Sequence, residues 1–165
     1  MKIIYLLSFC CLSAYSQNVS IKSYTQTREG IFINIDNGTL GIYPVSDDAI
    51  RIKFFKKALD SLTELIFTSK IETPKFKVFE NASTIEIKLK NINAILEKKT
   101  GKLVYTNAKG EIFLSEQVGS RKLIADTVSG EPCYLAEQSF ESSSNEAIFG
   151  LGQFQDGNYN LKNIS

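Results

Sequence analysis

The sequence predicts an all-β protein, an antiparallel β-sandwich, and three observations support that prediction. Apolar and polar residues alternate with a period of two in several short segments, turn-forming residues separate these segments, and no segment sustains a helical stripe beyond about two turns. Period-two alternation is typical of strands that turn one face to a core and the other to water. Roughly ten short strands at such regular spacing favour a sandwich.

The clearest alternation lies in the first ninety residues. The residues expected on one face of each strand are Ile31, Ile33 and Ile35; Ile50, Ile52 and Phe54; and Ile85, Ile87 and Leu89. Charged residues such as Arg51, Glu86 and Lys88 occupy the alternate positions. We therefore expect the core to include Ile33, Ile52, Phe54, Ile85, Ile87 and Leu89.

Turn signals divide the rest of the chain. Two glycine-ended turns, at 98–101 and 107–110, predict that residues 92–114 form a three-stranded meander. Residues 134–140 alternate again, and residues 147–150 are expected to form a short strand. Residues 57–65 could form a helical turn, and Pro74 lies in an extended connection before residues 76–79.

The first sixteen residues have the pattern of a secretory signal peptide. A short positive start, an almost wholly apolar run and the small-x-small sequence Ala14-Tyr15-Ser16 predict cleavage between Ser16 and Gln17. The run is too short for a membrane anchor. We therefore expect two segments, a signal peptide at 1–16 and a β-sandwich domain at 17–165, the alternative being a buried N-terminal strand or helix.

The cysteines indicate an exported bacterial protein. Cys10 and Cys11 lie in the signal, and lipidation is the weaker interpretation because no small residue precedes either of them. Cleavage leaves Cys133 alone, so the mature domain is expected to have no internal disulfide. That pattern fits a bacterial periplasm or extracellular space better than a eukaryotic secretory route.

Composition excludes several classes of function. The formal charge is +1, and no run of Lys or Arg stands apart from the acids, which argues against nucleic acid as a partner. The chain has no histidine, which removes the commonest general base and metal ligand. Zinc sites and the usual nucleophilic triads are therefore not expected, and neither a metal nor another cofactor is predicted.

The last eighteen residues, IFGLGQFQDGNYNLKNIS, combine amides, one carboxylate and aromatic rings. Such groups pair with sugar hydroxyls while a ring packs on the sugar's apolar face. We therefore predict sugar contact by Gln153, Asp156 and Asn158. A polar surface loop is the alternative, because Asn, Asp and Gly also favour turns. The Gly150-x-Gly152 pair lacks the helix of a dinucleotide site, which favours a backbone bend.

Glycosidic cleavage usually needs two carboxyl groups at a defined separation around the scissile bond. The chain has 18 acidic residues, but they are scattered over turns and polar strand faces. No pair stands out, and no catalytic residue is predicted.

Three blocks of sequence resemble the N-terminal region of family 31 glycoside hydrolases, especially secreted α-xylosidase and α-glucosidase-like members. The blocks are DNGTLGIYPVSDDAIRIKFF at 36–55, KKTGKLVYTNAKGEIFLSE at 98–116 and EAIFGLGQFQDGNYNLKN at 146–163. The resemblance covers roughly residues 19–165, and its most specific motif is Gly-Leu-Gly-Gln. It implies a galactose-mutarotase-like β-sandwich that precedes a (β/α)₈ barrel.

In that family the barrel carries both catalytic aspartates, and no residue of this chain matches either motif. The resemblance therefore implies a non-catalytic front piece of a retaining α-glycosidase, which hydrolyses α-xylosyl or α-glucosyl linkages in oligosaccharides. The barrel is expected as the missing intramolecular partner. The alternative left open is a stand-alone carbohydrate-binding or interaction module without catalysis.

Overall fold

The structure is a computed structural model that describes residues 21–36, 38–56, 72–150, 157 and 159–162. All regular secondary structure within these residues is β-strand. The strands are β1 (Ile21–Gln26), β2 (Ile31–Ile35), β3 (Gly38–Ser46), β4 (Ala49–Phe55), β5 (Lys77–Glu80), β6 (Thr84–Lys88), β7 (Ile92–Glu97), β8 (Leu103–Asn107), β9 (Ile112–Ser115), β10 (Lys122–Val128) and β11 (Glu131–Glu137).

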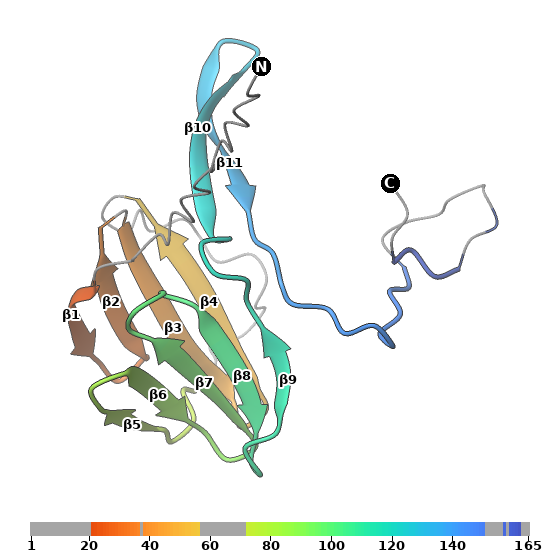
Figure 1. The fold of residues 1–165 in the computed structure, drawn as a ribbon. Helices are drawn as coiled ribbons and strands as arrows, with labels where there is room; N and C mark the ends of the chain where they lie inside the picture. Colours follow the sequence, from red (N-terminus) through yellow and green to blue (C-terminus); the bar gives the residue numbers. More distant parts are fainter. Residues whose placement is uncertain (1–20, 37, 57–71, 151–156, 158, 163–165) are drawn as a thin grey trace, which may run out of the picture.

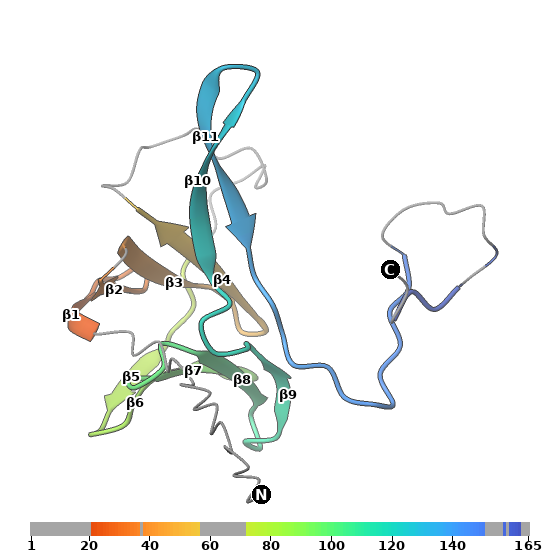
Figure 2. The same cartoon turned by 45° about the horizontal axis from the view of Figure 1, so that its top comes forward.

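Two antiparallel sheets form the body of the protein. The first has the order β1-β2-β3-β4, and the second has the order β5-β6-β7-β8-β9, so every strand pairs with its sequence neighbour. The sheets face each other, as Figures 1 and 2 show. This arrangement confirms the predicted all-β antiparallel sandwich. The meander expected at 92–114 is β7, β8 and β9.

The core lies between the two sheets. Its fully buried aliphatic side chains come from alternate positions of both sheets: Ile31, Ile33, Leu40, Ile42, Ile85, Ile87, Leu96 and Leu103. The predicted core residues Ile33, Ile85, Ile87 and Leu89 are buried as expected. Ile52 and Phe54 pack against this cluster but are only partly buried, because β4 is the outermost strand of its sheet.

A two-stranded ribbon, β10 and β11, continues the chain. It forms a sheet of its own and stands clear of the sandwich in both views (Figures 1 and 2). Its turn is made by Ser129 (φ 51°) and Gly130 (φ 86°), a conformation with two positive φ angles that favours small residues. Beyond Glu137 the described chain runs on without further strands.

Two sequence-based expectations about this part of the chain were wrong. Residues 147–150 are not a strand, because none of the strands in the described residues pairs with them. The strand expected at 134–140 is Glu131–Glu137 instead, with Phe140 forming only an isolated bridge to Glu116. Strand β10 was missed because Leu123, Ile124 and Ala125 interrupt the alternation. The expectations for residues 1–16 and 57–65 lie outside the described residues.

The described part of the chain contains no helix that is both long and apolar enough to cross a membrane.

Candidate functional site

The residues predicted to touch sugar, Gln153, Asp156 and Asn158, lie outside the described residues. Their described neighbours show how the segment is anchored. The side chain of Asn160 accepts hydrogen bonds from the amides of Ile148 (3.0 Å) and Lys162 (3.1 Å). The amide of Leu161 also donates to the carbonyl of Ile148 at 2.8 Å. Ile148 therefore lies beside residues 160–162.

Two further features of this segment agree with the sequence analysis. Gly150 has a φ angle of 90°, so a bend that glycine tolerates best is present there, as predicted. Tyr159 is 87% exposed, which leaves its ring available to a ligand or to a partner surface.

A hollow lies at the base of the ribbon, and we call it the root cavity. It has a volume of about 480 Å³. Its walls come from β2, β4, the β7–β8 turn and the segment that leads into β10. Its lining includes charged groups of both signs: Asp36, Lys56, Lys102, Glu116, Arg121 and Lys122.

An ion pair between Glu116 and Arg121 lies in the wall of the root cavity. The Glu116 side chain is 4% exposed and that of Arg121 is 13% exposed. Oε2 of Glu116 accepts a hydrogen bond from Nη2 of Arg121 and another from the amide of Leu103 at 3.0 Å. Nη1 of Arg121 donates to the carbonyl of Gly101 at 3.3 Å. The pair thus joins the start of the ribbon to the first residues of β8.

The pKa of Tyr105, which lies near this pair, is raised. Burial raises the pKa of Tyr105, and the negative charge of Glu116 raises it further. A tyrosine so placed remains a neutral phenol at physiological pH. It serves here as a core side chain, and not as a base.

The carboxylates around the root cavity already have partners within the protein. Besides Glu116, Asp36 pairs with Lys22 at 3.3 Å, and Glu141 pairs with Lys102 at 2.8 Å. The hydrogen bond from Lys102 is the main cause of a lowered pKa of Glu141. These contacts are those of carboxylates that hold the fold together. The described residues also bring no three His, Cys, Asp or Glu side chains together as potential metal ligands.

Sequence reasoning missed the role of Glu116, which it treated as one of many scattered acids. One signal was available. Glu116 follows Leu114 by two residues and so belongs to the same inward-facing side of the strand. Its partner could not be recognised, because Arg121 lies beyond a turn whose course the alternation pattern does not specify.

A second, apolar groove adjoins the root cavity and runs between β4 and β9, the outermost strands of the two sheets. Its volume is about 540 Å³, and its floor includes Ile50, Ile52 and Phe54. Phe113 is 58% exposed and Phe140 is 42% exposed along its rim. The core of the sandwich is therefore open to solvent along this side.

The ribbon also exposes apolar surface. Ile124 and Leu135 lie directly opposite each other and are 43% and 51% exposed. On the other face Tyr134 is 50% exposed, with the ammonium group of Lys56 lying 5.1 Å from the centre of its ring. The ribbon therefore exposes large apolar side chains on both of its faces.

No family model matches this sequence. Solved structures that share its fold include two GH31 α-xylosidases. A GH31 α-xylosidase from Xanthomonas citri superposes with a TM-score of 0.69 at 23% identity, over 83% of this chain and 15% of that chain. A GH31 α-xylosidase from a soil metagenome, complexed with xylose, gives a TM-score of 0.65 at 24% identity, over 85% of this chain and 23% of that chain.

Each match covers more than four fifths of this chain and only a small part of the enzyme. The chain spans less than a quarter of the length of either structure. At such low identity the likeness establishes a shared fold and leaves activity to further argument. The resemblance to the front part of family 31 enzymes is supported by this fold match, while the narrower galactose-mutarotase-like description remains a prediction.

Proposed function

We propose that the chain is the non-catalytic, N-terminal β-sandwich of a family 31 retaining α-glycosidase that hydrolyses α-xylosyl or α-glucosyl linkages. The observation that carries the proposal is the fold match: over four fifths of this chain superposes on a minor part of two GH31 α-xylosidases. Three blocks of resembling sequence occur in the expected order along the chain. In this proposal the chemistry belongs to a barrel encoded after Ser165.

The exposed apolar surfaces support a partner domain. The ribbon, the groove between β4 and β9 and the segment around Phe149, which is 67% exposed, all present large apolar side chains to solvent. We assign the barrel of the longer protein as the surface that covers the ribbon. We also retain the proposal that Gln153, Asp156 and Asn158 contact the oligosaccharide in the assembled enzyme, and that the protein acts after export to the periplasm or beyond.

Two experiments test this function. The 165-residue chain is first assayed with nitrophenyl α-xyloside and nitrophenyl α-glucoside, and turnover above a heat-killed control would refute the non-catalytic role. The reading frame is then expressed to its natural end. An in-frame barrel with activity on either substrate supports the proposal, whereas a genuine stop after Ser165 favours the stand-alone binding module.

Hydrogen exchange tests the assigned contact of the ribbon. In the longer protein, the amides of β10 and β11 should exchange more slowly than in the 165-residue chain, because a covering surface suppresses their local opening. The amides of β6 and β7 serve as the internal control, since both are interior strands of the five-stranded sheet, paired on each side. Equal exchange of the ribbon in the two proteins would mean that the barrel does not cover it.

The terminal segment is tested in the same longer protein. If Asp156→Ala and Asn158→Ala lower kcat/KM about tenfold, which is about 1.4 kcal/mol of transition-state binding, and leave thermal stability intact, these residues contact substrate. Lower stability with unchanged kinetics would instead identify the segment as packing between domains.

A further inference from the structure

Two lysines face each other on the outer side of the five-stranded sheet. Lys77 of β5 lies directly opposite Lys88 of β6, and both side chains are exposed. Like charges directly opposite each other in a sheet destabilise it. Neither lysine forms an ion pair within the described residues. The register of β5 on β6 thus maintains a local repulsion between two like charges.

Lys75 and Lys90 enlarge this feature, and we call the four residues Lys75, Lys77, Lys88 and Lys90 the lysine cluster. Lys75 lies just before β5 and Lys90 just after β6, and both line the same hollow as Lys77 and Lys88. Lys90 has one loose contact, 3.8 Å from Asp47, and its side chain remains 74% exposed. No ion pair of Lys75 is found in the described part of the chain.

Protection of a sheet edge explains only half of this cluster. Lysines on an outermost strand prevent unwanted pairing with other chains, and β5 is such a strand. Strand β6 is not, because β5 and β7 pair with its two sides. Edge protection therefore gives no reason for Lys88.

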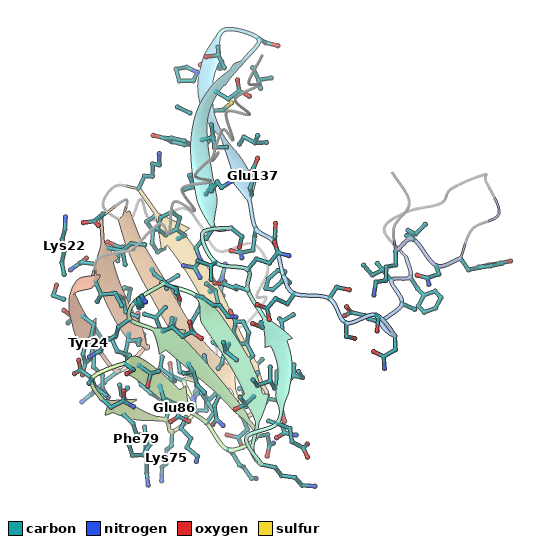
Figure 3. All side chains as sticks on the ribbon, viewed as in Figure 1. Lys22, Tyr24, Lys75, Phe79, Glu86 and Glu137 are labelled. Carbon is teal, nitrogen blue, oxygen red and sulfur yellow. The ribbon has the colours of Figure 1, made fainter. Side chains whose placement is uncertain are left out.

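The cluster adjoins an exposed aromatic ring. Phe79 follows Lys77 by two residues on β5, so it lies on the same face, and it is 50% exposed. Figure 3 shows Lys75 and Phe79 projecting together from the β5 side of the sandwich. An exposed phenyl ring offers a flat apolar surface on which the apolar face of a sugar can pack.

Polar groups continue the row across the sheet. Asn93 of β7 lies opposite Lys88, and Thr106 of β8 lies opposite Asn93. Nδ2 of Asn93 donates to Oγ1 of Thr106 at 3.0 Å. Oδ1 of Asn93 is buried and has no hydrogen-bond partner within the described residues. Asn93 and Thr106 are themselves buried, each 3% exposed, and Nδ2 of Asn93 also donates to the carbonyl of Asn107 at 3.1 Å. The exposed donors of this row are therefore the ammonium groups of Lys77 and Lys88.

The surroundings concentrate positive charge. The lysine cluster borders a broad hollow of about 1840 Å³ whose lining includes five basic residues and three acidic ones. The whole chain has a net charge of only +1, so the surplus of this one region exceeds that of the entire protein. The hollow therefore has a positive charge of its own, although Glu86 lies beside it, opposite Phe79 on the same face.

We propose that the outer face of β5 and β6 binds an acidic polysaccharide, with its carboxylate or sulfate groups between Lys77 and Lys88 and a sugar ring on Phe79. Charge density favours this ligand over nucleic acid. Duplex DNA carries a charge every 1.7 Å or so and would press phosphates against Glu72 and Glu86 as well as against the lysines. An acidic polysaccharide carries its charges farther apart and leaves uncharged rings between them. The site does not depend on the proposed glycosidase assignment, since it lies on the sandwich itself.

The test measures binding of the full 165-residue chain by affinity electrophoresis and calorimetry at low and high salt. The ligands are polygalacturonate and chondroitin sulfate as carboxylated and sulfated chains, neutral xylan, and single-stranded and duplex DNA. We expect polygalacturonate, chondroitin sulfate or both to bind, neutral xylan to bind at least about tenfold more weakly, and added salt to weaken the interaction because counterions compete.

Matched variants identify the residues. Lys77→Gln combined with Lys88→Gln should weaken binding about tenfold or more while leaving the melting temperature unchanged or raised, since the variant removes a repulsion. Lys99→Gln combined with Lys109→Gln removes two exposed lysines from turns outside the hollow and should leave binding unchanged. Phe79→Ala should weaken binding, and Phe79→Tyr should restore it.

Three results would overturn the proposal. The first is equal affinity for xylan and the two acidic chains, and the second is an equal loss of affinity in both lysine pairs. The third is tighter binding of DNA than of either polysaccharide, which would assign the surface to nucleic acid. None of these results depends on the activity of the longer protein, so they neither support nor contradict the glycosidase proposal.

Discussion

Arg121 places its guanidinium group against the buried carboxylate of Glu116, and this contact joins the start of the ribbon to the sandwich. Both side chains are largely withdrawn from water, and the amide of Leu103 donates to the same carboxylate oxygen. Taking two charges out of water costs free energy, which the contact must offset. The contact therefore positions the ribbon more than it stabilises the fold.

Removing one partner of this pair should be costly. Arg121→Met leaves the Glu116 carboxylate buried without its cation, and the free energy of unfolding should fall by about 3 kcal/mol. The double variant Glu116→Leu with Arg121→Met should recover most of that loss, because neither charge then remains buried. Urea unfolding measures both values. Lys122→Met is the control, since its pair with Glu137 is half exposed and should contribute less than about 1 kcal/mol. A double variant as unstable as the single one would contradict this account.

Adjacent residues of β6 should respond in opposite ways to truncation. Ile87 is fully buried, so Ile87→Ala should lower the free energy of unfolding by more than about 2 kcal/mol. Lys88 is exposed on the other face, and Lys88→Ala should be neutral or slightly stabilising, because it relieves the repulsion with Lys77. Chemical denaturation of the two variants decides the matter. Similar losses would show that the assigned register of β6 is wrong.

Acid should weaken a contact between the two sheets. The carboxylate of Glu80 accepts hydrogen bonds from Lys98, at 2.5 Å, and from Tyr24, which lower its pKa below the ordinary value of 4.5. The folded protein then binds fewer protons than the unfolded chain. This contribution to stability is therefore present above the ordinary pKa and is lost as the pH falls through the folded value.

Glu80→Gln should accordingly flatten the acid limb of the stability curve, measured by urea unfolding between about pH 5 and pH 3. Tyr24→Phe should raise the pKa of Glu80, which NMR titration of the side chain detects. Glu86→Gln is the control, because Glu86 forms no ion pair within the described residues. If the free energy of unfolding of Glu80→Gln falls with pH as steeply as that of the wild type, Glu80 does not cause the loss of stability in acid.

Export should leave a defined N-terminus. The positive start, apolar run and Ala14-Tyr15-Ser16 predict a mature chain that begins at Gln17. Intact-mass analysis of the protein from its native host checks the cleavage site. Retention of Met1, or the mass of a diacylglycerol on Cys10 or Cys11, would contradict the prediction.

The sequence by itself determined the strands and the sides on which their residues lie. Ile85, Ile87 and Leu89 alternate with charged residues, and burial of an alternating face against a second layer is the only arrangement that withdraws all three from water. The meander at 92–114 followed from two glycine-containing turns for an equally local reason. The likeness to family 31 enzymes also came from the sequence, through the order of three blocks.

Only the tertiary structure decided which side chains meet. Lys77 and Lys88 are separated by a turn, and nothing in the alternation of either strand specifies that they lie opposite each other; the register of β5 on β6 does. The composition therefore concealed a basic face whose lysines are dispersed along the chain. Glu116 and Arg121 meet for the same reason, because a turn reverses the chain between them. Alternation is a local property of one strand, whereas pairing depends on the backbone hydrogen bonds between strands and on the path of the chain that connects them.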